Sequence, residues 1–270
     1  MSRAVPLSPL ARRYEHFLLD LDGCVWVGEA PTPGAVEAVA ALREDGRHPA
    51  FITNDPRLSG EDLVRKLWRL GFQASLEEVV TVGGALQHFL AARSDGGGSA
   101  FVIGAAPIWR HVEDAGLRIV NDSDFAPRAD VVVVAGHDDF DYDELRTATQ
   151  AVLAGAALVA AGRDPTFPMP DGPWPGTGAV LAAVEAATGR SALVVGKPEA
   201  GIFRTALDRL GEGHALVVGD RLDSDLRGAH AAGLDAAIVL TGVTDAQAAA
   251  AAQEPAPVAV APDLRTLLLA

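Results

Sequence analysis

Two aspartates separated by one residue, Asp20 and Asp22, come at the end of the apolar run at residues 17–19. In a strand, residues i and i+2 project to the same side, so both carboxylates would face one crevice. Carboxylates held that close repel each other, and a hard cation with oxygen ligands, or a proton on one of them, relieves the repulsion. Gly23 lets the backbone turn tightly beside whatever is bound. The alternative is that the pair only caps the following loop, and the pair alone does not decide between these readings.

A second polar segment follows another apolar run, in PAFITNDP at residues 49–56. The hydroxyl group of Thr53 and the exposed backbone N–H of Asn54 suit a phosphate oxygen at the end of a strand. Taken by itself, this segment favours an ordinary turn.

Lysine is scarce in this chain, which has Lys66 and Lys197 and otherwise uses arginine. Lys197 follows the apolar run at residues 193–196, where an ammonium group can neutralise a carboxylate and a phosphoryl oxygen together. The scarcity of lysine weakens the alternative of a surface lysine at a turn. Lys66 falls on the exposed side of a predicted helix, and we interpret it as a surface charge.

A further acidic segment lies in ALVVGDRLDSDLRGA at residues 215–229. Asp220 ends an apolar strand, as Asp20 does, and can share a cation with it. Asp223 is interpreted as helix N-terminal charge, a reading that also remains open for Asp225. Each of these signals is weak alone. Together, four strand ends that carry Asp-x-Asp, Thr, Lys and Asp in this order form a strong joint signal.

The elements that must position these residues follow an alternating pattern. Short apolar runs, each followed by a segment of helical period, predict parallel strands linked by crossover helices. The fold class is therefore α/β, with a Rossmann-like open parallel sheet whose ligands bind at the carboxyl ends of the strands. We predict strands at 16–19, 49–53, 79–82, 193–196, 215–219 and 236–241, and helices at 33–45, 59–70, 201–210 and 224–232.

A second alternating set lies in the middle of the chain. It has predicted strands near 101–104, 131–135 and 157–161 and a helix at 142–154. We predict two domains on this basis: a core formed by residues 1–82 and 190–270, and an inserted α/β domain at residues 83–189.

Composition and charge narrow the classes of function. The chain has 270 residues, of which 49% are hydrophobic, enough for one large domain or two modest ones. The formal net charge of −14 argues against a nucleic acid or an anionic membrane as partner, because binding phosphates needs a basic face. Short, broken apolar stretches and a single cysteine, Cys24, predict a cytoplasmic protein without disulfides or membrane segments.

The segments DLDGCVW, ITNDP, GKP and GDRLDSD resemble, in this order, the four motifs of the haloacid dehalogenase superfamily. They are most similar to its NagD-like or p-nitrophenyl phosphatase-like branch, which carries a large α/β cap between the Thr and Lys motifs. This chain has its insertion at the same place, and VVVVAGHDDFDYDELRTA and PGTGAVLAAVE within it are also similar to the family. The resemblance implies a magnesium-dependent phosphomonoesterase acting on a small phosphorylated metabolite, with a cap that sets specificity and mediates a homodimer.

The same resemblance assigns the chemistry to named residues. Asp20 is the implied nucleophile, which forms an aspartyl-phosphate. Asp22 is the implied acid that protonates the leaving oxygen and then the base that activates water. Mg²⁺ is held by the Asp20 carboxylate, the Asp22 main-chain carbonyl and Asp220, as its preference for oxygen ligands requires.

The remaining implied roles concern charge and orientation. Thr53 and the Asn54 N–H hold phosphate oxygens. Lys197 offsets the concentrated negative charge during phosphoryl transfer. Asp225 orients Lys197 or a metal-bound water.

Two departures from the family pattern bear on specificity. Asp55 stands where the family usually has a second Asn, which adds negative charge near the phosphate loop. The cap segment often written Thr-Asn-x-Asp is AAGRDP at residues 160–165, so Arg163 and Asp164 are candidate specificity residues. On sequence alone, a solvated turn is the favoured reading of these two.

A catalytically silent protein of another class remains an alternative, using the same acidic pocket for phosphate or metal as receiver domains do. The second domain disfavours it, because receivers have about the length of a single domain. A dinucleotide-dependent oxidoreductase is excluded, since no G-x-G-x-x-G follows a predicted strand.

Overall fold

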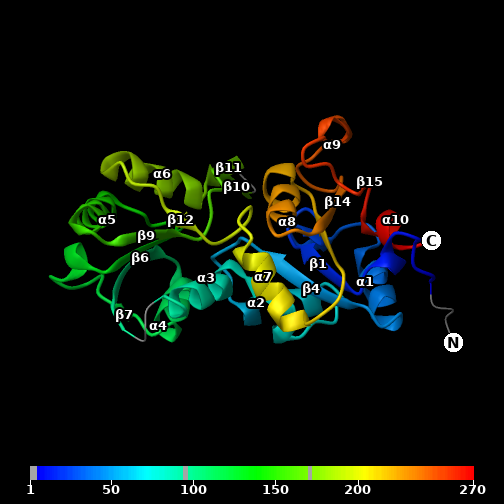
Figure 1. Ribbon diagram of the computed structural model, residues 1–270, viewed down its shortest axis with the longest axis horizontal. Helices are drawn as coiled ribbons and strands as arrows, with labels where there is room; N and C mark the ends of the chain where they lie inside the picture. The colour runs from blue at the N-terminus through cyan, green and yellow to red at the C-terminus, as the bar shows by residue number, and fades with distance from the viewer. Residues whose placement is uncertain (1–4, 94–96, 170–171) are drawn as a thin grey trace. The chain divides into compact units, whose positions relative to one another are not determined.

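The computed structural model describes residues 5–93, 97–169 and 172–270 (Figure 1). The chain divides into two compact units. The core unit comprises Met1–Thr53, Gly60–Val80 and Lys197–Ala270, and the inserted unit comprises Asn54–Ser59 and Thr81–Gly196. The sequence placed the limits of the inserted domain at residues 83 and 189, so residues 190–196 fall in the inserted unit here rather than in the core.

Within the described residues, the core unit contains a six-stranded sheet in the order β15-β14-β13-β1-β4-β5. β1 pairs in parallel with β13 on one side and with β4 on the other, and β13, β14 and β15 continue the parallel pairing. All five residues of β1 are buried, as expected of a parallel strand covered on both faces. The strands are β1 (His16–Asp20), β4 (His48–Thr53), β5 (Val79–Thr81), β13 (Ala215–Gly219), β14 (Asp235–Val239) and β15 (Ala259–Ala261).

Helices follow the strands of the core unit, as the alternating sequence pattern predicts. α7 contacts β1 and β4, α1 contacts β4, and α8 contacts β14. The predicted helix at 224–232 is in fact a π-helical turn, η4, that runs into α8; such turns are frequent at functional sites. The bounds are η1 (Ala11–Arg13), α1 (Ala35–Glu44), α2 (Gly60–Arg69), η2 (Leu76–Glu78), α7 (Gly201–Leu210), η4 (Leu222–Leu226), α8 (Arg227–Ala231), α9 (Ala246–Ala251) and α10 (Leu264–Leu268), with the small hairpin of β2 (Trp26–Val27) and β3 (Ala30–Pro31).

The inserted unit is built on a five-stranded sheet in the order β12-β9-β8-β6-β7, again within the described residues. Its neighbouring strands are parallel, so the α/β class is confirmed for both units. α5 and α6 pack together on one face of this sheet, and α3 and α4 pack together on the other (Figure 1). The bounds are α3 (Val82–Ala91), β6 (Ser99–Gly104), α4 (Ala106–Asp114), β7 (Arg118–Ile119), η3 (Ala126–Arg128), β8 (Val131–Gly136), α5 (Tyr142–Ala154), β9 (Ala157–Ala160), β10 (Thr166–Met169), β11 (Gly172–Pro175), α6 (Thr177–Thr188) and β12 (Leu193–Val194).

One predicted strand belongs to the other sheet. We expected residues 193–196 to form a strand of the core, but only Leu193–Val194 is a strand, and it pairs with β9 of the inserted unit. Leu193 is exposed and Val194 only partly buried, as expected at the edge of a sheet. Lys197 therefore opens the returning core segment directly after a strand of the inserted unit.

In the described parts of the chain, no helix combines the length and the apolar character needed to span a membrane.

Candidate active site

The candidate site is at the carboxyl ends of β1 and β13. β1 ends at Asp20, and β13 ends at Gly219, immediately before Asp220. Because Leu19 lies opposite Val218 in the parallel pairing, both strands bring an acid to the same edge of the sheet. On the other side of β1, Ile52 of β4 lies opposite Asp20, so the buried residue Thr53 follows at this edge too.

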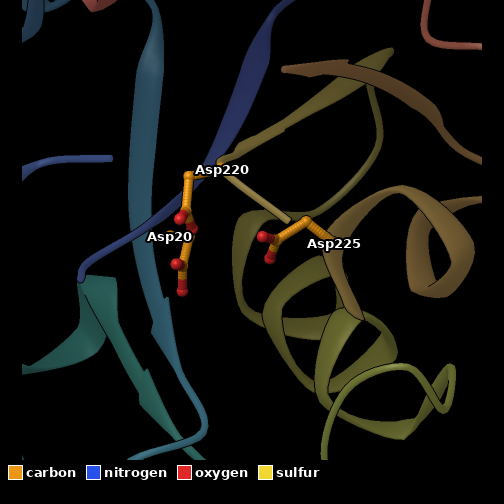
Figure 2. Close-up of side chains that lie close together, drawn as sticks. All are labelled: Asp20, Asp220 and Asp225. Carbon is orange, nitrogen blue, oxygen red and sulfur yellow. The ribbon is translucent and has the colours of Figure 1, made fainter. Parts of the chain in front are cut away.

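Three buried carboxyl groups gather at this edge. Asp20, Asp220 and Asp225 each contribute a carboxylate oxygen, and these oxygens lie within 4.8 Å of one another. Figure 2 shows the three side chains close together, with the carboxyl group of Asp225 directed toward the other two. Asp225 comes from η4, the π-helical turn that follows β13. The spacing from Asp220 to Asp225 therefore depends on that turn.

Lys197 supplies the positive charge within this cluster. Its side chain is buried, and its ammonium group donates hydrogen bonds to Oδ1 of Asp20 and, at 2.7 Å, to Oδ1 of Asp225. The backbone N–H of Arg221 donates to the second oxygen of Asp225 at 3.1 Å. Asp225 thus holds the lysine in place, and the lysine connects Asp225 with Asp20.

The electrostatics of the cluster favour a bound cation. Burial raises the pKa of Asp20 well above its ordinary value; Lys197 opposes this, and the charges of Asp225 and Asp220 add to it. Burial and then the Asp225 charge raise the pKa of Asp220 to about 6. Burial disfavours the charge on Lys197, but the carboxylates of Asp20 and Asp225 outweigh it and raise its pKa. Three acids thus share one buried amine, which leaves negative charge uncompensated.

The residues present fit a hard divalent cation. Among the described residues, Oδ1 of Asp220 is buried and has no hydrogen-bond partner. Buried polar atoms in native proteins are almost always satisfied, so an orphaned carboxylate oxygen beside two other carboxylates indicates a missing ligand. Carboxylate oxygens are the donors that Mg²⁺ and Ca²⁺ prefer.

A loop after β14 completes the surroundings of Asp220. The backbone N–H of Val243 donates to Oδ2 of Asp220 at 2.6 Å, and the Thr241 hydroxyl donates to the Gly23 carbonyl at 2.5 Å. A Cβ at position 242 would collide with the Asp220 carboxylate, and one at Gly23, where φ is +85°, would come within 2.5 Å of Oδ2. Both glycines are therefore needed for the acid to fit between the two loops.

Asp22 and Lys66 are connected through one tryptophan. The indole N–H of Trp26 donates to Oδ1 of Asp22 at 2.8 Å, and the Lys66 Nζ atom lies 4.4 Å from the centroid of the Trp26 ring. The Lys66 side chain is only 15% exposed and also pairs with Glu29 at 3.3 Å. The interpretation of Lys66 as a plain surface charge is wrong, because its side chain is largely buried and its ammonium group lies over the Trp26 ring.

Asn54, Asp164 and Arg163 lie in the inserted unit. The Asn54 side-chain amide donates to Asp164 Oδ2 at 3.1 Å. Arg163 instead forms a bidentate pair with Glu185 of α6, at 2.7 and 2.9 Å. Asp164, one of the two candidate specificity residues, therefore contacts a residue of the four motifs through a hydrogen bond.

Asp55 also lies in the inserted unit, in the segment after Asn54. It forms a salt bridge with Arg57 at 2.8 Å, so a cation of its own loop compensates the charge that distinguishes this position.

Comparison with known proteins places the chain in a family. A model of haloacid dehalogenase-like hydrolases matches residues 17–118, and a HAD-hydrolase-like model matches residues 194–267. D-glycerol 3-phosphate phosphatase from Mycobacterium tuberculosis is 38% identical over 263 residues, covering 97% of this chain and 73% of that protein. The chain belongs to the haloacid dehalogenase-like hydrolases. The family resemblance of the four motifs is thereby confirmed.

Solved structures agree with this membership. The crystal structure of glycerol phosphate phosphatase from Mycobacterium tuberculosis in complex with magnesium superposes with a TM-score of 0.89 at 39% identity, covering 97% of this hydrolase and 78% of that chain. p-Nitrophenyl phosphatase from Archaeoglobus fulgidus gives a TM-score of 0.86 at 31% identity, covering 94% and 98% of the two chains.

Some residues of the site escaped the sequence analysis. Gly242 contributes by having no Cβ, and Val243 contributes its backbone N–H. Neither residue type therefore points to a functional site in the sequence. The strand predicted at 236–241 could have located them, because its carboxyl end falls on the same edge of the sheet. Trp26 stands inside the first motif, but only the structure shows its bond to Asp22.

Without a cation, the folded hydrolase is expected to lose stability as the pH rises. Asp220 has a pKa of about 6 when folded, against 3.8 for a free aspartate, so the folded state binds this proton more tightly than the unfolded state. The free energy of unfolding should therefore fall between about pH 4 and about pH 6, by up to about 3 kcal/mol for this group. A divalent cation replaces the proton, so MgCl₂ should raise the melting temperature more at about pH 7.5 than at about pH 5.

Asp220→Asn should abolish this cation-dependent stabilisation. The matched control is Asp223→Asn, an exposed aspartate nearby that pairs with Arg221. Thermal unfolding with MgCl₂ and with EDTA measures both variants. Equal stabilisation of Asp220→Asn and wild type would show that Asp220 is not a ligand.

Gly242→Ala is expected to displace the Asp220 carboxylate, because the new methyl group has no room. The affinity for the divalent cation should fall about tenfold or more, which corresponds to roughly 1.4 kcal/mol. Titration calorimetry with MgCl₂ measures the change. Gly97→Ala is the control, since a Cβ there meets nothing within 4 Å. Unchanged affinity in Gly242→Ala would mean that the loop does not set the position of Asp220.

Proposed function

We propose that this protein, a phosphatase of the haloacid dehalogenase-like family, hydrolyses the phosphate monoester of a small metabolite through an aspartyl-phosphate at Asp20. The observation that carries the proposal is the buried bridge from Lys197 to Asp20 and Asp225, beside the orphaned oxygen of Asp220. A nucleophilic carboxylate, a fixed ammonium and a cation-binding acid are the parts that phosphoryl transfer requires. The alternative of a silent receiver-like protein gains no support from relatives that are named as phosphatases and match nearly the whole chain.

In this proposal the core residues act in sequence. A carboxylate oxygen of Asp20 attacks phosphorus, and the bond from phosphorus to the ester oxygen breaks. Asp22 gives its proton to the departing oxygen and later takes a proton from the water that attacks the aspartyl-phosphate, which frees Asp20 and releases phosphate. Lys197 remains an ammonium throughout, because its carboxylate partners raise its pKa.

Mg²⁺ would be held by Asp20, Asp220 and the main-chain carbonyl of Asp22, and it would supply the positive charge that lets Asp20 react as an anion and offsets charge on the phosphoryl group. Thr53 and the Asn54 N–H would bind phosphate oxygens. Asp225 would keep Lys197 in place, and Gly23 would make room for the metal-binding acid.

We extend the proposal to the inserted unit. It would act as the cap that selects the substrate, with Asp164 as the candidate specificity residue that contacts Asn54, and Arg163 and Asp55 modifying its charge. Glycerol phosphates come first in a substrate screen, because one relative is named D-glycerol 3-phosphate phosphatase. A homodimer and a cytoplasmic location remain predictions from the sequence.

Asp20→Asn is expected to lower the release of p-nitrophenol from its phosphate by at least about a thousandfold, because no other side chain can replace a covalent nucleophile. The variant should fold, since the amide removes charge from an over-acidic cluster. Initial rates with MgCl₂ and with EDTA measure the effect. Asp138→Asn, an exposed aspartate of the inserted unit, is the matched control.

Two results would contradict the proposal. One is turnover by Asp20→Asn at the wild-type rate. The other is a folded wild-type protein that releases phosphate from none of a panel of phosphorylated metabolites in MgCl₂.

A further inference from the structure

Asp22 differs from the other acids of the site in its surroundings. Its side chain is exposed, whereas Asp20, Asp220 and Asp225 are buried. An exposed carboxylate can turn among several rotamers, and most of these point it away from any single reacting atom. A general acid must stay within hydrogen-bond reach of the oxygen that it protonates. The site therefore needs a device that fixes Asp22.

The Trp26 side chain provides such a device. The ring is 1% exposed, and its N–H donates to Oδ1 of Asp22 at 2.8 Å. The backbone holds the two residues opposite each other: the N–H groups of Val25 and Trp26 donate to the Leu21 carbonyl at 2.9 and 3.0 Å, and the Gly23 N–H donates to the Trp26 carbonyl at 2.7 Å. The donor is therefore rigid, although its acceptor lies at the surface.

Lys66 strengthens this donor. Its ammonium group sits 4.4 Å from the ring centroid and is anchored by Glu29 at 3.3 Å. A cation over the face of an indole is attracted by the ring electrons and draws them away from the N–H. A more polarised N–H makes a stronger hydrogen bond to a carboxylate, because hydrogen bonds that share polarised groups reinforce one another.

We propose that Trp26 is the positioning residue for Asp22, and that Lys66 tunes it from above the face of the ring. The inference rests on the proposed function, in which Asp22 is the acid and base. The indole N–H can donate but not accept, so it fixes Oδ1 as the acceptor and leaves Oδ2 as the oxygen that carries the proton. Oδ2 gives that proton to the ester oxygen as its bond to phosphorus breaks, and regains one from the attacking water.

Aryl phosphates of similar size separate this role from a structural one. p-Nitrophenol leaves readily without protonation, whereas phenol and p-methoxyphenol need it more. For Trp26→Phe, we expect kcat/KM to fall by about 10- to 100-fold with phenyl phosphate and by no more than about threefold with p-nitrophenyl phosphate, since general acid catalysis contributes about 10²–10⁴-fold where it is needed. A plot of log(kcat/KM) against leaving-group pKa should therefore become steeper.

Trp68→Phe is the matched control. Trp68 also donates its indole N–H, but to the Ala74 carbonyl at 2.8 Å, and its side chain is 60% exposed. For Trp68→Phe, the slope of log(kcat/KM) against leaving-group pKa should equal that of the wild type. Lys66→Met keeps the aliphatic stem and removes the charge, and it should steepen the slope in the same direction by a smaller amount.

Trp26 is buried, so Trp26→Phe can fail to fold, and a second replacement guards against this. Site-specific incorporation of β-(3-benzothienyl)alanine at position 26 keeps the shape of the ring and replaces only the N–H by sulfur. Circular dichroism and thermal unfolding verify the fold of each variant before the kinetics are measured.

The outcomes distinguish the inference from the proposed function. A steeper slope for the benzothienyl protein, with an unchanged slope for Trp68→Phe, supports the positioning role. An unchanged slope with a uniform loss for all aryl phosphates overturns it and leaves the phosphatase proposal intact. A folded wild-type protein that hydrolyses no aryl or alkyl phosphate overturns both.

Discussion

The architecture of the site depends on one buried ion pair network, in which the Lys197 ammonium is shared between Asp20 and Asp225. Burying charges is unfavourable unless each is paired and hydrogen-bonded, and here the acids outnumber the amine. The network is therefore balanced only when a further positive charge joins it. Burial, and after it the charges of the neighbouring acids, raise the pKa values of Asp20 and Asp220. A bound cation would offset the excess negative charge and so favour the ionised form of both acids.

The backbone creates the space for this concentration of acids. Glycines stand at 23, 219 and 242, where an added Cβ would meet the carboxyl group of Asp220 or Asp225. These positions are at or just beyond the ends of β13 and β14 and in the loop after β1, so the main chain can lie close against the carboxyl groups at this edge of the sheet. Main-chain N–H groups of Val243 and Arg221 can then reach the carboxylates directly. Such donors are fixed by the sheet and need no reorganisation during a reaction.

The sequence was sufficient for the parallel α/β class and for the convergence of Asp20 and Asp220, because strand ends in a parallel sheet share one edge. Lys197 and Asp225 join them as the four motifs imply, although the strand before Lys197 pairs in the other sheet and Asp225 stands in η4. The sequence was not sufficient to predict contacts that the backbone makes. It also did not show which of the two sheets a short strand joins. Val243 contributes an N–H that every residue has, and Leu193–Val194 pairs with β9 although its composition suits either sheet. The place of Lys66 over Trp26 is a tertiary contact between α2 and β2, which helical periodicity alone does not reveal. The domain limits and the roles of the site residues are still predictions.

The position of β1 has a consequence for the biosynthesis of the chain. This strand pairs with β4, which emerges from the ribosome soon after it, but its other neighbour, β13, begins only at Ala215. Until about four fifths of the polypeptide has been made, the apolar segment HFLLD presents one unpaired edge. The nascent protein passes through synthesis of the whole inserted unit in that state, so a chain that ended there would expose an unpaired strand edge, which favours aggregation.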